Sequence, residues 1–197
     1  MTQADENITG VTGAHTTDGL PHGVTSLTPF IAIRGAAEAI EFYQNVFGAR
    51  LIDKTEFGGV IVHADIDFGT GHLQLGEPNE EYGLIPAPAG AGSGASGPHG
   101  AGAGSGASGP HGAGAGSGPD ADCYSLGLYR PNVDEVVAKA VEAGATVREA
   151  PATFVSGDRF ASIRDPFGVR WSVMTRVEDL SEEESARRVA DWAATQQ

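Results

Sequence analysis

Apolar residues along the chain fall into two series of predicted elements that have the same order. The first helix is clear, because Phe42, Tyr43 and Val46 lie at helical spacing and Gly48 follows as a C-cap. Apolar and β-branched runs on either side predict strands. The elements expected in the first series are a strand over 27–33, a helix over 36–47 and strands over 50–54, 60–68 and 72–75.

The second series repeats this order of strand, helix and three strands. Asn132 is an N-cap for its helix, Gly144 ends that helix, and Val141 is expected on the apolar face with Val133, Val136, Val137 and Ala140. Asp165-Pro166-Phe167-Gly168 has the composition of a type I turn between two strands. The expected elements are a strand over 123–130, a helix over 133–143 and strands over 146–150, 160–164 and 169–174.

Three further segments lie outside the two series. Residues 1–23 are polar and aperiodic, which predicts a disordered tail. Within 83–121 the sequence GAGSGASGPHGA occurs twice in succession, which predicts a flexible low-complexity linker. Ser181 and Glu184 form a capping box that opens a last helix, either docked through Val189 and Trp192 or solvated. The predicted domains are a tail (1–23), a first module (24–82), a linker (83–121), a second module (122–177) and a C-terminal helix (178–197).

Composition narrows the range of functions. The net charge of −14 and the absence of a Lys/Arg cluster argue against nucleic acid and anionic membranes as partners. Cys123 is the only cysteine, so an intrachain disulfide is excluded and a cysteine-based zinc site is disfavoured. Without a secretory signal or an apolar run of about 20 residues, the sequence favours the cytoplasm.

Polar residues gather on one face of the strands over 60–68 and 72–75. A two-residue turn at Thr70-Gly71 would pair Asp67 with Gln74 and Asp65 with Gly76. One face would then be apolar, and it would contain Val62, Ala64, Ile66, Phe68, Leu73 and Leu75. The other face would contain His63, Asp65, Asp67, His72 and Gln74.

Three interpretations of this polar face compete. A histidine beside carboxylates can act as a general acid or base, with His63 as the candidate. His63, Asp65 and His72 can instead form an irregular metal site, or the face can be a hydrogen-bonding wall or plain solvent-exposed sheet. Arg159 has two similar alternatives, because it can clamp an anionic ligand or pair with Asp158 or Asp165.

Particular motifs resemble a known superfamily. The paired strand–helix–three-strand series resembles the vicinal oxygen chelate superfamily, which includes glyoxalase I, extradiol dioxygenases and bleomycin resistance proteins. The motifs that resemble its PhnB-like branch are Thr28-Pro29-Phe30, Ala39-Ile40-Glu41-Phe42-Tyr43, Phe47-Gly48-Ala49, Val62-His63-Ala64-Asp65, Gly157-Asp158-Arg159-Phe160, Asp165-Pro166-Phe167-Gly168 and Val177-Glu178-Asp179-Leu180-Ser181. The resemblance implies an α+β fold in which two βαβββ modules form a cupped mixed sheet, and it implies a homodimer.

The same resemblance implies where a metal would bind. Metal-using members carry His or Glu at four positions, which here are Thr28, Gln74, Ser125 and Ser172. Because divalent metals prefer imidazole, carboxylate or thiolate, the usual four-ligand site is missing. No cofactor is predicted, and a divalent metal is expected only at an irregular site. The cavity that remains would be lined by His63, Asp65, His72, Gln74, Tyr129, Phe154, Arg159, Trp171 and Ser172, although aromatic residues in strands are also typical of a core.

Three functions follow from these features. The first is a metal-independent protein that binds and sequesters a planar or cationic small molecule, as bleomycin resistance proteins do. The alternative is a glyoxalase-like lyase or isomerase that uses His63 or an irregularly held metal. The third is a stable dimer that has no small-molecule role.

Overall fold

The computed structural model describes residues 9–86, 122 and 124–196. The chain divides into two compact units, Met1–Leu84 and Ile85–Gln197, and each is described by itself. Most of the expected linker, the first eight residues and Cys123 lie outside the described residues. Among the described helices, none is long and apolar enough to cross a bilayer.

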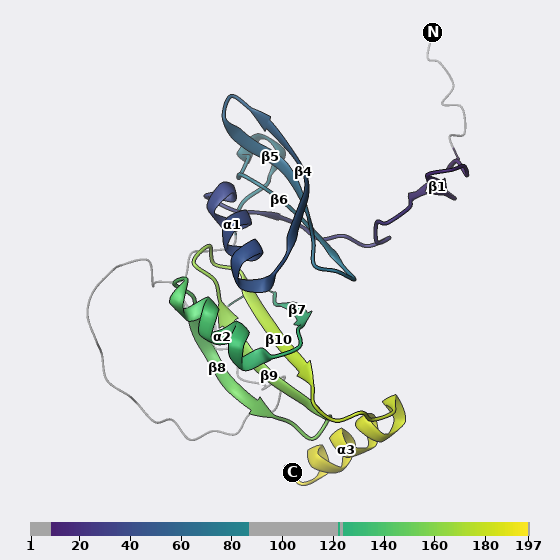
Figure 1. Cartoon of the computed structure of the whole chain (residues 1–197), viewed down its shortest axis with the longest axis vertical. Coiled ribbons are helices and arrows are strands. Elements are labelled where there is room, and N and C mark those ends of the chain that lie inside the picture. Colours follow the sequence, from purple (N-terminus) through teal and green to yellow (C-terminus); the bar gives the residue numbers. More distant parts are fainter. Residues whose placement is uncertain (1–8, 87–121, 123, 197) are drawn as a thin grey trace, which may run out of the picture. The chain divides into compact units, whose positions relative to one another are not determined.

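The first unit contains one complete βαβββ module (Figure 1). Strand β3 pairs in parallel with β6, and β6, β5 and β4 form an antiparallel meander, so the sheet order is β3-β6-β5-β4. A single turn of 3-10 helix, η1, follows the sheet. The bounds are Phe30–Ala32 (β3), Ala36–Phe47 (α1), Arg50–Phe57 (β4), Val60–Asp67 (β5), His72–Gly76 (β6) and Glu80–Tyr82 (η1).

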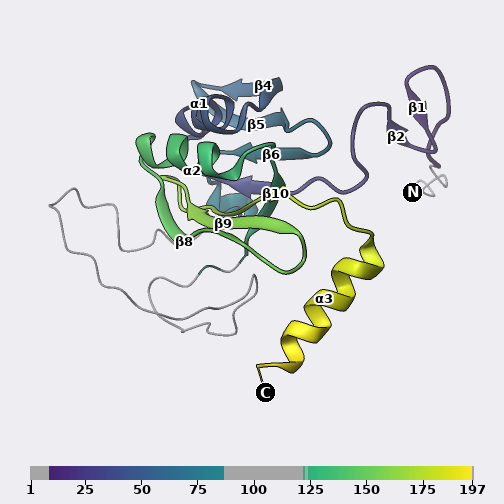
Figure 2. The same ribbon diagram turned by 60° about the horizontal axis from the view of Figure 1, so that its bottom comes forward.

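The second unit repeats this topology and adds a C-terminal helix (Figure 2). Its first strand again pairs in parallel with its last, and the sheet order is β7-β10-β9-β8. The bounds are Leu126–Tyr129 (β7), Val133–Glu142 (α2), Thr146–Thr153 (β8), Asp158–Arg164 (β9), Arg170–Arg176 (β10) and Glu182–Ala194 (α3). The prediction of an α+β chain built from two βαβββ modules is therefore confirmed.

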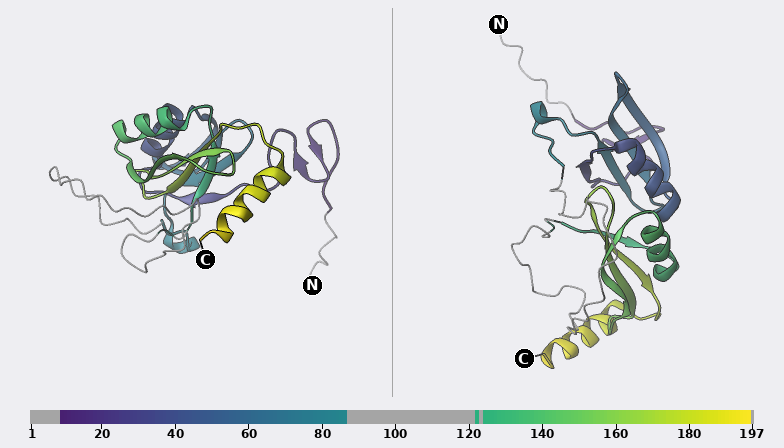
Figure 3. Two further views of the ribbon diagram at one scale, coloured as in Figure 1. Left: turned by 90° about the horizontal axis from the view of Figure 1, so that it is seen from below. Right: turned by 90° about the vertical axis from the view of Figure 1, so that its left-hand side faces the viewer.

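The core of each unit lies between its helix and one face of its sheet (Figure 3). In the first unit, Tyr43 and Phe47 of α1 stack with ring centroids 5.9 Å apart, and the ring of Phe68 lies 6.3 and 6.2 Å from theirs. In the second unit, the buried face of α2 consists of Val133, Val136, Val137 and Ala140. Val141 is exposed, so the prediction that it faces the core is wrong.

The helix ends follow the chemistry expected from the sequence. Helix α1 begins at Ala36 and ends at Phe47 as predicted, and Gly48 adopts the left-handed conformation with φ 64°. The Asn132 side chain accepts hydrogen bonds from the amides of Asp134 and Glu135 at 3.1 and 3.3 Å. Ser181 Oγ accepts from the Glu184 amide at 3.2 Å, which confirms the cap of α3.

Strand β5 contains a bulge that changes which residues are buried. Thr55 pairs with His63 and Glu56 pairs with Ile61, so Val62 is the extra residue. Ile61 is buried and Val62 is exposed, so the expected place of Val62 on the apolar face is wrong. A Cβ atom on Gly76 would lie 2.5 Å from the Val62 carbonyl oxygen, so this close approach of the two backbones requires glycine.

The register of β5 against β6 differs from the prediction, but the polar face does not. Asp67 pairs with His72 and Asp65 with Gln74, so the connection is two residues longer than a two-residue turn. Phe68 and Gly71 close it through a backbone hydrogen bond of 2.9 Å. A shift of two residues preserves the side-chain alternation of a strand, so the predicted polar face is retained.

The N-terminal segment contains structure that the sequence analysis did not predict. Strands β1 (Thr16–Thr17) and β2 (Leu20–Pro21) pair as a two-stranded hairpin. Asp18 and Gly19 form its turn with φ of 48° and 80°, and Asp-Gly is a favoured pair for such turns. The expectation of disorder is therefore wrong for this part of the tail.

Candidate functional site

The predicted polar residues of the first sheet occupy one face, opposite the core. His63, Asp65 and Asp67 alternate along β5 with buried Ala64 and Ile66. On β6, His72 and Gln74 alternate with buried Leu73 and Leu75. We call this surface the polar face of the first module.

A histidine–aspartate pair lies on the polar face. His72 Nδ1 is 2.8 Å from Asp65 Oδ1, and their side chains are 11% and 13% exposed. Because a carboxylate only accepts hydrogen bonds, it favours the tautomer in which Nδ1 carries the proton. The neutral ring then has Nε2 as its basic nitrogen. The sequence analysis chose His63 as the candidate acid or base, whereas the structure gives the carboxylate partner to His72.

His63 instead belongs to an aromatic platform. Its ring stacks on that of Phe30, with centroids 6.2 Å apart and planes 30° apart. Phe30 is 36% exposed, and it pairs with Gln74 in the sheet register. An exposed ring beside an amide side chain can stack on a planar group and also hydrogen-bond to it.

Asp67 has a structural role at the end of β5. Its carboxylate accepts a hydrogen bond from the Gly69 amide at 2.6 Å and one from Arg50 at 2.7 Å. The Gly69 bond and then the Arg50 bond lower the pKa of Asp67. This carboxylate therefore holds the β5–β6 turn and an arginine.

The four positions at which the resemblance places metal ligands carry neutral side chains, two in each unit. Thr28 Oγ1 lies 3.1 Å from Thr25 Oγ1 and 3.2 Å from the Thr25 carbonyl oxygen. Ser125 Oγ and Ser172 Oγ hydrogen-bond to each other at 2.8 Å. Neutral hydroxyls that already bond to one another, together with the single amide oxygen of Gln74, are poor ligands for such an ion.

The irregular metal site of His63, Asp65 and His72 stays a prediction. Within the part of the chain that the structure describes, no group of three or more His, Cys, Asp and Glu side chains is placed to hold a metal ion. His72 and Asp65 pair with each other, and His63 stacks on Phe30.

The remaining predicted site residues belong to the second unit. Arg159 binds the Asp134 carboxylate of α2 through Nε and Nη2, both at 2.7 Å. Its partner is therefore neither Asp158 nor Asp165, and the bond lowers the pKa of Asp134 and raises that of Arg159. Tyr129 is exposed, whereas Trp171 is buried and donates from Nε1 to Asp165 at 3.0 Å.

Phe154 lines a pocket of about 730 Å³ that the sequence analysis missed. The pocket lies between the end of β8 and helix α3, and Phe154 meets Trp192 edge-on with centroids 5.0 Å apart. The capping box predicted α3, and the sequence left open whether Val189 and Trp192 dock the helix or it is solvated. No local sequence signal indicated which strand the helix contacts. The lining residues are Thr153, Phe154, Val155, Glu178, Arg187, Arg188, Asp191, Trp192 and Thr195.

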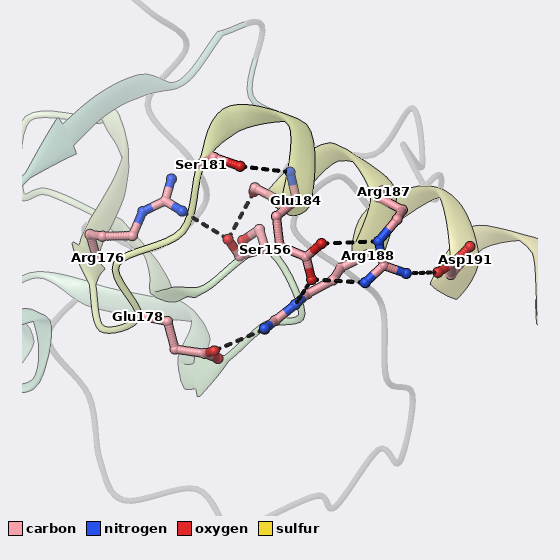
Figure 4. A network of polar contacts seen from close by, with 9 residues as sticks. Ser156, Arg176, Glu178, Ser181, Glu184, Arg187, Arg188 and Asp191 are labelled. Carbon is pink, nitrogen blue, oxygen red and sulfur yellow. Dashed lines mark hydrogen bonds and ion pairs between the residues drawn. The ribbon is translucent and has the colours of Figure 1, made fainter.

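Ion pairs run along α3 beside this pocket, and Arg188 and Ser185 join the helix to residues outside it (Figure 4). Glu184 accepts from Arg187 at 2.8 and 3.0 Å and from Arg188 at 2.9 Å, and Arg188 reaches Glu178 at 2.8 Å. These bonds, that of Arg187 first, lower the pKa of Glu184 to about 2. Ser185 adds a hydrogen bond of 2.8 Å to the Ser156 carbonyl oxygen. The cations are therefore neutralised by neighbouring carboxylates.

Solved structures with a similar fold come from several bacteria. TioX from Micromonospora sp. ML1 is 20% identical over 77% of this chain and 98% of TioX, with a TM-score of 0.49. A PhnB protein from Bacillus cereus is 14% identical over 77% of this chain and 99% of its own, with a TM-score of 0.49. TnmS3, an antibiotic binding protein from Streptomyces sp. CB03234, is 15% identical over 78% and 98%, with a TM-score of 0.47.

Comparison at the level of sequence gives a family. No curated protein matches the chain. A family profile matches residues 23–173, which span both modules and the segment between them. The chain therefore belongs to the Glyoxalase/Bleomycin resistance protein/Dioxygenase superfamily.

Proposed function

We propose that the protein binds and sequesters a small planar, cationic molecule on the polar face of the first module, without a metal ion. Superfamily membership supports a small-molecule ligand. The observation that carries the proposal is the Phe30–His63 platform, because the ring of Phe30 is exposed beside Gln74 and the His72–Asp65 pair. The net charge of −14 favours the approach of a cationic ligand.

Bleomycin is a suitable probe, because it combines a planar bithiazole with a cationic tail. Metal-free bleomycin, added to tag-free protein in the presence of a chelator, is expected to raise the melting temperature, since a ligand that binds only the folded state stabilises it. Phe30→Ala is expected to weaken binding roughly 2- to 10-fold, the equivalent of one lost aromatic contact. Calorimetric titration measures the Kd.

Phe57→Ala is the matched control, because Phe57 is an exposed phenylalanine of the same module that lies outside the platform. It is expected to retain the wild-type affinity. Equal losses in the two variants would refute the platform as the binding surface. Stoichiometric Zn, Ni, Fe or Mn in the tag-free protein, lost in His63→Ala, would refute a metal-independent mode.

A second candidate function is a glyoxalase-like isomerase or lyase, and the 2.8 Å contact of His72 with Asp65 favours it. In that mechanism Nε2 of His72 removes a proton from the carbon next to a carbonyl group, and Asp65 stabilises the imidazolium that forms. The test is turnover of the methylglyoxal–glutathione hemithioacetal in the presence of a chelator. Turnover that His72→Gln abolishes and His63→Gln retains would establish this function. Sequestration alone predicts no turnover in any variant.

The third function from the sequence, a dimer without a small-molecule role, is tested with the same preparations. Sedimentation of the wild type measures the oligomeric state with and without the probe. A homodimer whose melting temperature responds to neither bleomycin nor metal would favour this third function.

A further inference from the structure

Three arginines from adjacent strands surround one carboxylate in the second unit. Asp122 Oδ1 is 3.3 Å from Arg164 Nε, and Asp122 Oδ2 is 3.7 Å from Arg170 Nη1 and 4.0 Å from Arg148 Nε. Glu149 lies on the same cluster and accepts from Arg170 Nη2 at 2.8 Å. We call the three guanidinium groups the arginine cradle.

The sheet register explains why these arginines meet. Arg164 ends β9 and pairs directly with Arg170, which begins β10. On β8, Val147 pairs with Ile163 and Glu149 with Ser162, so Arg148 is the extra residue of a bulge. Bulges redirect side chains and occur often beside binding sites. The cradle is therefore formed at one end of the sheet by residues of three successive strands.

The side chain that fills the cradle is poorly bound there. The side chain of Asp122 is 5% exposed, yet neither carboxylate oxygen has a hydrogen-bond partner among the described residues. Buried carboxylates normally accept several hydrogen bonds, and guanidinium groups favour short, paired contacts with oxyanions. Asp122 thus acts as a counterion at 3.3–4.0 Å rather than as a well-fitted partner.

Two of the arginines are held in place by other bonds. Arg170 Nε donates to Ser162 Oγ at 2.9 Å, and Arg164 Nε donates to the Gly168 carbonyl oxygen at 3.3 Å. These contacts orient the guanidinium groups before any ligand arrives. Pre-organised donors bind an oxyanion at a lower entropic cost than mobile ones.

We propose that the arginine cradle binds the phosphate group of a small phosphorylated ligand, and that Asp122 is an internal competitor which the ligand displaces. Glu149, which pairs with Arg170, stays in place when Asp122 is displaced. A phosphate monoester carries about −1.5 to −2 at neutral pH, so it interacts more strongly with a group of guanidinium groups than one carboxylate does. The phosphate group also has three terminal oxygens, so each arginine can donate to an acceptor of its own. This site lies in the second module and does not depend on the proposed function.

Inorganic phosphate is the probe that tests the cradle. Calorimetric titration of the full chain in chloride buffer is expected to detect phosphate binding, and Asp122→Asn is expected to tighten it about tenfold, because the competing charge is removed. Arg170→Gln is expected to weaken it about tenfold or more, as for the loss of one charge-assisted hydrogen bond. Acetate and a sugar phosphate, titrated in parallel, distinguish a carboxylate site from a phosphate-ester site.

Arg50→Gln is the matched control, because Arg50 pairs with a carboxylate in the first unit, and it is expected to leave phosphate affinity unchanged. The proposal is overturned if phosphate binds neither wild type nor Asp122→Asn, if Asp122→Asn weakens binding, or if acetate binds as tightly as phosphate. Should Asp122→Asn fail to fold in chloride, recovery of its circular dichroism signal on adding phosphate supports the proposal, and no recovery overturns it.

Discussion

At the scale of single residues, Asp165 joins a turn to the core of the second unit. Its Oδ1 accepts from the amides of Phe167 and Val169 at 3.0 and 2.8 Å, and its Oδ2 accepts from Trp171 Nε1 at 3.0 Å. The carboxylate is buried, so all three bonds form away from competing water. One side chain therefore fixes both the path of the backbone and the orientation of the tryptophan.

We expect Asp165→Ala to destabilise the second unit by roughly 3 kcal/mol, because it leaves buried donors without an acceptor. Urea unfolding followed by tryptophan fluorescence measures this loss, since Trp171 and Trp192 both lie in that unit. Asp53→Ala is the control, because Asp53 is exposed on β4, and a change within about 0.5 kcal/mol is expected. A similar effect of both substitutions would contradict the assigned role.

The ion pairs of Glu184 make a prediction about pH. Because its pKa falls from 4.5 to about 2 on folding, this group stabilises α3 above pH 4.5, and the contribution is lost as the pH falls through about 2. A carboxyl titration of Glu184 by NMR is expected to have its midpoint near pH 2 in the wild type. Arg187→Gln is expected to move the midpoint toward 4.5, and Arg50→Gln is expected to leave it unchanged. Equal midpoints in all three proteins would contradict the ion-pair geometry.

The hydrogen bonds of a single side chain were predictable where its partners are close in sequence. Asn132 and Asp165 bond to amides two to four residues away, and the sequence predicted the N-cap and the turn. The partner of Arg159 was missed, because Asp134 is separated from it by 25 residues and meets it only after α2 packs on the sheet. The neutral donor set at Thr28, Gln74, Ser125 and Ser172 came from the family resemblance, and its effect on ligand binding stays a prediction.

At the scale of elements, the bulge in β5 determines which side chains enter the first core. Strict alternation would bury Val62, but the bulge buries Ile61 and exposes Val62. Gly76 permits this arrangement, because any side chain there would collide with the Val62 backbone. Residues 60–68 alone do not contain this information, since it depends on the strand across the sheet.

We expect Gly76→Ala to destabilise the first module by about 1–3 kcal/mol, because its Cβ would lie 2.5 Å from a backbone oxygen that cannot rotate away. Hydrogen exchange of the β5 and β6 amides is expected to accelerate, while α2 exchanges as before. Gly71→Ala is the control, since a Cβ there meets nothing within 4 Å. Equal protection in the two variants would argue against the close approach.

At the scale of the whole molecule, overall charge does not reveal that three arginines meet at one end of a sheet. The chain has a net charge of −14 and no run of basic residues, and the one arginine that the sequence analysis considered for an anion, Arg159, is not part of the cradle. The arginines of the cradle lie on three strands, and only the sheet register brings them together. Composition and periodicity predicted the two modules, because each depends on local patterns. They did not predict the bulge in β8 or the meeting of the three arginines.

The pairing of first and last strands in each sheet has a consequence for synthesis on the ribosome. Strand β10 lies between β7 and β9, so a nascent chain that stops before Arg170 has no partner for β7. The first module, by contrast, has all of its strands once Gly76 has been translated, before the glycine-rich repeat begins at Gly90. The amino-terminal half can therefore fold while the other half is still being made.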